Sequence, residues 1–139
     1  MSVEIDIRYD GGLRCTAVHG PSGHQLLTDA PKDNGGQGAA FSPTDLVATA
    51  LGSCMLTIMG LVAQRNGWDL AGTTVQVIKD MAAAPLRRIG KLTAVITLPP
   101  GRSWSAEDRQ RLERAAELCP VKQSLHADVQ TVIDFCYPK

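Results

Sequence analysis

The feature that most constrains the fold is an uncharged, apolar stretch that runs from Leu46 to Ala63. The stretch is long enough for a membrane span to be considered. It is interrupted by small and polar residues such as Thr49, Gly52 and Ser53, and the chain contains no second stretch of this kind. The remaining sequence has the pattern of a soluble fold. We therefore expect a helix buried in the core of a soluble protein and no association with a membrane.

Both ends of this helix are marked in the sequence. Ser42 is the predicted N-cap, Pro43 fits the first helical position, and Asp45 completes a capping box. At the other end, Gly67 follows Asn66 and is expected to adopt the left-handed conformation that ends a helix. The helix is apolar almost all round, which predicts burial on every side.

Shorter elements flank the helix. Alternating apolar and polar residues predict strands, and glycine- and proline-rich turns separate them. The expected strands cover residues 3–9, 13–19, 24–28, 70–81, 88–98 and 129–135, with further helices at residues 105–118 and 121–126. Residues 29–41 are rich in Gly, Asn, Asp and Pro and are expected to form a loop. This order of elements is typical of an α+β fold in which a sheet covers the central helix.

The size of the chain limits how completely it can enclose that helix. A length of 139 residues suits one domain, residues 1–139. One small domain can hardly wrap a helix that is apolar all round. We therefore expect a homodimer in which a second copy buries the far side of the helix.

Composition narrows the choice of partners and compartment. Lys and Arg number 14, Asp and Glu number 14, and the formal net charge is zero, so a nucleic-acid partner is not expected. The first residues, Met1 to Asp6, alternate charged and apolar side chains and do not resemble a secretory signal. We expect a cytoplasmic protein, in which the four cysteines are reduced at rest.

Two of these cysteines lie where a thiol could be reactive. Cys54 is in the middle of the apolar helix beside Gly52 and Ser53, although a buried free cysteine often only fills space. Cys119 precedes a proline at the start of a short helix, where backbone N–H groups lower the pKa of a thiol. Lys122 lies one turn further on and could add a positive charge. For Cys119 the alternative is a helix-capping role.

Two thiols of this kind suggest peroxide reduction. One thiolate attacks the O–O bond and becomes a sulfenic acid, and a second thiol condenses with it to a disulfide that external thiols reopen. Competing chemistry has less support. The chain lacks a Cys-x-x-Cys motif, and its glycines before the central helix lack the Lys-Ser/Thr pair of a phosphate loop. Its histidines, His19, His24 and His126, have no ligand spacing.

Two segments resemble the cysteine signatures of the OsmC/Ohr family. The first runs from Phe41 through Ser42-Pro43-Thr44-Asp45 to Gly52-Ser53-Cys54, and the second is Cys119-Pro120-Val121-Lys122-Gln123-Ser124-Leu125. The loop Asp33-Asn34-Gly35-Gly36 and the early Gly11-Gly12-Leu13-Arg14 fit the same family. The resemblance covers nearly the whole chain and keeps the expected order.

The resemblance implies an OsmC-like fold, with antiparallel sheets around a long buried central helix in an intertwined homodimer. It implies active sites at the subunit interface, with Cys54 as peroxidatic and Cys119 as resolving cysteine. It also implies organic hydroperoxides as substrates and dithiols of the lipoyl type as reductants, with neither a metal nor a bound organic cofactor. The expected activity is that of a thiol-dependent hydroperoxide reductase in oxidative stress defence.

Members of the Ohr type hold the first cysteine with an arginine and a glutamate. Arg14 is the candidate for the arginine, since a guanidinium near Cys54 favours the thiolate. The position of the glutamate is occupied by Thr44, and the neighbouring Asp45 is the remaining acidic candidate. This difference places the chain nearer the OsmC-like branch.

Two further interpretations of the function stay open at this point. The fold could bind a small hydrophobic ligand or sense redox state with little turnover, as the threonine at position 44 suggests. A thiol–disulfide exchange enzyme is a weaker possibility. Cys15 and Cys136 match neither signature, and structural roles are expected for both.

Overall fold

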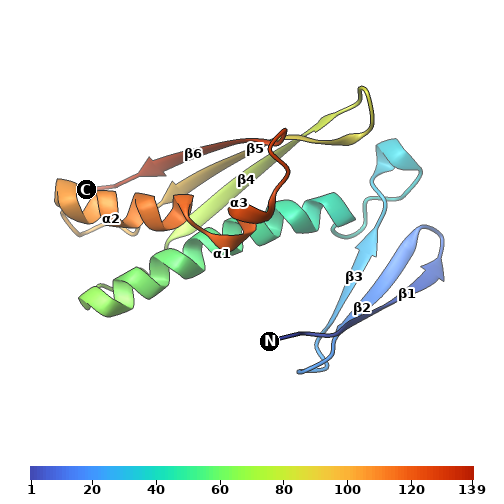
Figure 1. The fold of residues 1–139 in the computed structure, drawn as a ribbon, viewed down its shortest axis with the longest axis horizontal. Helices are drawn as coiled ribbons and strands as arrows, with labels where there is room; N and C mark the ends of the chain where they lie inside the picture. Colours follow the sequence, from blue (N-terminus) through green and yellow to red (C-terminus); the bar gives the residue numbers. More distant parts are fainter. The chain divides into compact units, whose positions relative to one another are not determined.

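The computed structural model describes all residues from Met1 to Lys139. The chain forms two compact units, Met1–Val47 and Ala48–Lys139. Figure 1 identifies the elements of each unit.

The first unit is built on a three-stranded antiparallel sheet. Its strands are β1 (Ile5–Gly11), β2 (Arg14–His19) and β3 (Gln25–Asp29), in the order β1-β2-β3. These strands confirm the three expected from alternation. A short 3-10 turn, η1 (Lys32–Asn34), lies within the segment expected to be a loop.

Helix α1 (Pro43–Asn66) begins and ends where the sequence predicts. The backbone N–H of Ser42 donates to Oδ2 of Asp45 at 2.9 Å, and the backbone N–H of Asp45 donates to Oγ of Ser42 at 3.1 Å. These two bonds form the predicted capping box. At the other end Gly67 has a φ of 69°, which is the left-handed conformation expected there.

The second unit contains a mixed sheet. Its strands are β4 (Thr74–Ala82), β5 (Arg88–Thr97) and β6 (Gln130–Cys136), in the order β4-β5-β6 (Figure 1). β4 pairs with β5 in antiparallel fashion, whereas β5 and β6 are parallel. The antiparallel sheets that the resemblance implies are present, and the parallel pairing of β6 is the one exception. Between β5 and β6 the chain crosses over through α2 (Ala106–Glu117) and α3 (Pro120–Ser124), and such a crossover returns it in the same direction.

The core of the second unit combines one face of α1, one face of α2 and alternate residues of β5. The fully buried large side chains include Leu51, Met55, Met59, Leu92, Ile96 and Leu112. The predicted cap of α2 is confirmed, because Oγ of Ser105 accepts the backbone N–H of Asp108 at 3.1 Å.

Within one chain, burial of α1 is confined to one side. Of its most apolar window, 33% is buried, and Leu61 on the open side is 44% exposed. α1 is the one helix long and apolar enough to cross a membrane, a property that core helices of soluble proteins share. The open side is the part that the sequence predicts a second copy to cover.

Candidate functional site: the cysteine pair on α1 and α3

Cys54 is placed by a close approach of α1 to β4. A Cβ atom on Gly52 would lie 2.9 Å from Cγ2 of Val77 and 3.1 Å from Cγ1 of Val75. A larger residue at this position would require the helix or the valine side chains to move. Cys54 follows half a turn later and is half-buried, with a free thiol.

Cys119 is the N-cap of α3 and is fully buried. Its Sγ accepts the backbone N–H of Lys122 at 3.4 Å, and Pro120 occupies the first turn of the short helix. The expected capping role is therefore present. It coexists with a free thiol, because Cys119 forms no disulfide in this structure.

The structure brings these two thiols together. Burial is the largest influence on the thiol of Cys119 and raises its pKa. The backbone N–H groups of Lys122 and Val121 act in the opposite direction, while a hydrogen bond and a charge interaction with Cys54 raise the pKa further. The sequence predicts a lowered pKa from the helix terminus, and this is wrong because burial outweighs the terminus. The raised pKa favours the protonated thiol of Cys119.

Two contacts stabilise the connection between α2 and α3 near Cys119. Nζ of Lys122 lies 3.0 Å from Oε2 of Glu117, and Nε2 of Gln123 donates to the carbonyl oxygen of Glu117 at 3.0 Å. Lys122 was expected to assist Cys119 through its charge. Its ammonium group instead pairs with Glu117, and the contact with the sulfur is made by its backbone N–H.

Arg14 lies at the start of β2 in the first unit. Its Nη2 donates to Oε1 of Gln37 at 2.9 Å, and its Nε is 3.8 Å from Oδ1 of Asp29. Asp29 and Gln37 were missed by the sequence reasoning. The register that sets Arg14 opposite Asp29 was the only signal that could have identified the carboxylate. A role for Arg14 at Cys54 stays a prediction.

Asp45 belongs to the first unit, at the first turn of α1. One of its oxygens is used in the capping box with Ser42. This structural role was expected, and an additional role toward Cys54 stays a prediction.

The remaining two cysteines lie on strands. Cys15 is half-buried on β2, opposite Tyr9 and Thr28, and Cys136 is exposed at the end of β6. No group of three or more His, Cys, Asp or Glu side chains is arranged to hold a metal ion.

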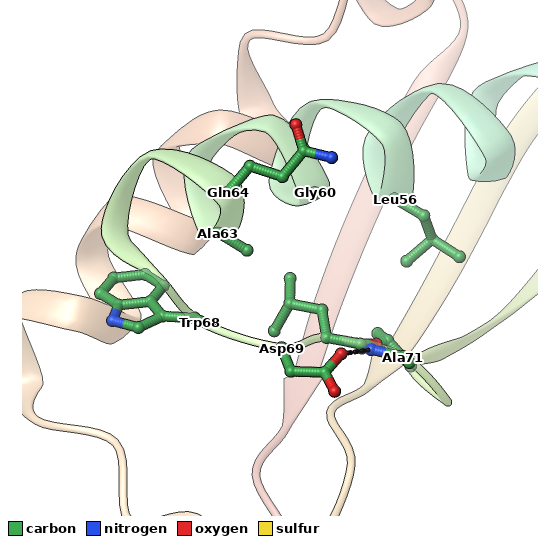
Figure 2. Close-up of a pocket in the computed structure, with 9 residues that line it drawn as sticks. Leu56, Gly60, Ala63, Gln64, Trp68, Asp69 and Ala71 are labelled. Atoms are coloured by element: carbon green, nitrogen blue, oxygen red, sulfur yellow. Dashed lines mark hydrogen bonds between the residues drawn. The ribbon is translucent and has the colours of Figure 1, made fainter.

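A cavity of about 330 Å³ lies against the C-terminal half of α1 (Figure 2). Its lining does not include either cysteine of the pair and consists of Leu56, Gly60, Ala63, Gln64, Trp68, Asp69, Leu70, Ala71 and Thr73. Figure 2 shows the loop after α1 turning beneath the helix, held by the backbone N–H of Ala71, which donates to Asp69 at 2.9 Å.

Comparison with known proteins gives a consistent result. The sequence profile of a family described as OsmC-like protein matches residues 35–134, a range that includes both Cys54 and Cys119. A search of curated proteins finds no match. A solved structure from Psychrobacter arcticus 273-4, assigned by name to osmotic stress induction and the detoxification response, is 42% identical. Its TM-score is 0.88, and the match covers 94% of this chain and 93% of that one.

Two more distant structures share the fold. One is an organic hydroperoxide resistance protein from Legionella pneumophila, 16% identical with a TM-score of 0.77, covering 98% of this chain and 97% of that one. The other is the organic hydroperoxide resistance protein OhrB of Bacillus subtilis, 18% identical with a TM-score of 0.68, covering 97% and 98%.

Proposed function

The chain belongs to the OsmC-like protein family, and from that premise we propose that it reduces organic hydroperoxides, with Cys54 as peroxidatic and Cys119 as resolving cysteine. The observation that carries the proposal is the hydrogen-bonded contact between two free thiols on α1 and α3. This contact allows Cys119 to reach the sulfur of Cys54 in the second step of such a reaction.

The chemistry can be written with these two residues. The Cys54 thiolate attacks the outer oxygen of the hydroperoxide, so an S–O bond forms, the O–O bond breaks, and the alcohol leaves after taking up a proton. Cys119 then attacks the sulfenic sulfur, forming the disulfide and releasing water. A dithiol of the lipoyl type reduces the disulfide by exchange and is itself oxidised.

The names of similar structures support the choice of substrate. Those from Legionella pneumophila and Bacillus subtilis are organic hydroperoxide resistance proteins, and that from Psychrobacter arcticus 273-4 is linked to detoxification. An oxidative stress role in the cytoplasm follows as part of the proposal. Arg14 is proposed to orient the peroxide, because a guanidinium offers several N–H donors in a fixed plane.

We further propose that the working form is a homodimer with active sites at the subunit interface. The open side of α1 and the apolar side of the first sheet both expose large side chains, among them Leu61 at 44% and Ile7 at 68%. Exposed apolar surfaces of this kind mark sites of association. A second copy of the chain is the proposed partner, and neither nucleic acid nor a membrane is.

Substitution of single cysteines tests the assignment. Cys54→Ser should abolish reduction of cumene hydroperoxide with dihydrolipoamide as the reductant, because no other thiol receives the oxygen. Cys119→Ser should allow one turnover and leave a sulfenic acid that dimedone traps and mass spectrometry detects. Cys136→Ser, at an exposed position at the end of β6, is the matched control and should retain wild-type turnover. Full activity in Cys54→Ser would refute the proposal.

A second candidate is a small-molecule binding or redox-sensing protein with little turnover. It is favoured by Thr44 at the glutamate position and by the cavity beside Leu56 and Trp68. Measurement of hydroperoxide turnover alongside ligand-induced thermal shifts separates the two functions. A stabilising small apolar ligand in a protein without turnover would favour binding.

A further inference from the structure

A buried carboxylate lies beside Arg14 on the first sheet. Asp29 is the last residue of β3 and is 2% exposed. The register of β2 and β3 sets it directly opposite Arg14, so both side chains point to the same side of the sheet. Nε of Arg14 lies 3.8 Å from Oδ1 of Asp29, which is an ion pair longer than a hydrogen bond.

The two oxygens of Asp29 have different surroundings. Oδ2 accepts the backbone N–H of Ala39 at 3.0 Å, whereas Oδ1 is buried and has no hydrogen-bond partner. A buried carboxylate is costly unless a nearby cation compensates its charge. Arg14 is the cation that the sheet register brings to the unpartnered oxygen. The guanidinium is therefore held toward Asp29 by charge.

The loop that follows Asp29 returns to the same arginine. Gln37 accepts a hydrogen bond from Nη2 of Arg14 at 2.9 Å. The loop depends on Gly36, because a Cβ there would lie 1.8 Å from the carbonyl oxygen of Ala30. Asp29 and Gln37 thus restrict the guanidinium at two of its nitrogens. A guanidinium has more N–H donors than these two partners use, so Arg14 remains able to donate to a substrate.

We propose that Asp29 is the positioning residue that fixes the guanidinium of Arg14 for hydroperoxide reduction, with Gln37 as a second support. The inference rests on the proposed function, in which Arg14 orients the peroxide. Asp29 acts through Arg14 and does not itself touch the reacting atoms.

Asp29→Asn tests this role. Asparagine keeps an oxygen for the N–H of Ala39 and removes the charge that holds Arg14. We expect kcat/KM for cumene hydroperoxide to fall by roughly tenfold to a hundredfold, as misplacement of an orienting group does. The matched control is Asp10→Asn, since Asp10 pairs with Arg8 at 2.7 Å on the same sheet, and it should keep wild-type kcat/KM. Wild-type kcat/KM in a folded Asp29→Asn protein would overturn the inference.

A double-mutant cycle separates positioning from a general structural role. Arg14→Met removes the guanidinium, so adding Asp29→Asn to it should lower kcat/KM no further. Losses that multiply in the double variant would show that Asp29 acts independently of Arg14, and the proposal would fail.

Thermal unfolding tests the pairing without an activity assay. Arg14→Met should lower the melting temperature by leaving a buried charge uncompensated, and the further change Asp29→Asn should recover part of that loss. If the two substitutions change the melting temperature additively, the pairing is overturned. If Asp29→Asn alone does not fold, folding restored by Arg14→Met supports the pairing, and an unfolded double variant overturns it. If the variants show this coupling in melting temperature but the wild-type protein does not reduce hydroperoxides, the proposed function is refuted. The pairing of Asp29 with Arg14 then still stands.

Discussion

At the scale of single residues, the balance of forces on Cys119 predicts how its thiol titrates. Burial is the largest cause of its raised pKa, and the interaction with Cys54 adds to it. In Cys54→Ala the second contribution is lost while burial remains. We expect the pKa of Cys119 to fall relative to the wild type. The pH dependence of the ¹³Cβ chemical shift in ¹³C-cysteine-labelled protein measures this. An unchanged or higher pKa would contradict the contact between the two thiols.

Tyr137 gives a second prediction at this scale. Burial, followed by the hydrogen bond from its hydroxyl to Oε2 of Glu113 at 3.0 Å, raises its pKa well above the ordinary tyrosine range. The unfolded chain releases this proton near pH ~10 while the folded chain keeps it, so native stability falls as pH rises through that region. Tyr137→Phe lacks this dependence.

We expect Tyr137→Phe to cost about 1–2 kcal/mol of unfolding free energy at neutral pH, through the lost hydrogen bond. The difference from wild type should shrink as the pH is raised from about 9 to about 11. Urea unfolding at both pH values measures it. A difference that stays constant or grows would show that the hydroxyl does not hold its proton in the folded protein.

At the scale of elements, two glycines of α1 predict opposite effects of the same substitution. Gly52→Ala places a methyl group 2.9 Å from Cγ2 of Val77 on β4, so the helix or Val77 must shift and the protein should lose roughly 1–3 kcal/mol. A methyl group on Gly60 would have nothing within 4 Å, and Gly60→Ala should gain up to about 1 kcal/mol from helix propensity. Chemical denaturation of both variants tests the contact. If both substitutions changed the unfolding free energy equally, the close approach of the helix to β4 would not be confined to Gly52.

The displacement expected in Gly52→Ala also bears on the cysteine pair, because Cys54 follows on the same helix. We expect slower disulfide formation between Cys54 and Cys119 after one equivalent of hydroperoxide, measured by quenched-flow alkylation and mass spectrometry. Gly60→Ala should form the disulfide at the wild-type rate. A wild-type rate in Gly52→Ala would show that the pair tolerates movement of the helix.

The elements also show what the sequence could and could not predict. The capping box at Ser42 and Asp45 and the terminal Gly67 are local signals, so both ends of α1 could be predicted. The parallel pairing of β6 with β5 depends on how α2 and α3 return the chain, and no local pattern encodes that. Asp29 was missed for the same reason, since its place opposite Arg14 follows from strand register.

At the scale of the whole molecule, the first sheet has one strongly apolar side. Ile7 is opposite Ala17, and Ala17 is opposite Leu26, so these residues point to the same side. Ile5, Ile7 and Tyr9 alternate along β1 on this side and are 57%, 68% and 63% exposed. The polar residues of β1, such as Arg8, lie on the opposite side. Such a surface is expected to be covered when the protein assembles.

If a second copy covers this side, a charge placed there should weaken the dimer. We expect Ile7→Asp to raise the dimer dissociation constant by at least about a hundredfold, because burying an unpaired carboxylate costs several kcal/mol. Gln25→Glu adds a charge at an exposed position on the other side of the sheet and should leave the dimer intact. Sedimentation equilibrium measures both, and the melting temperature of the wild type should rise with protein concentration. A monomeric wild type, or equal effects of the two substitutions, would mean that the apolar side of this sheet does not join two copies of the chain.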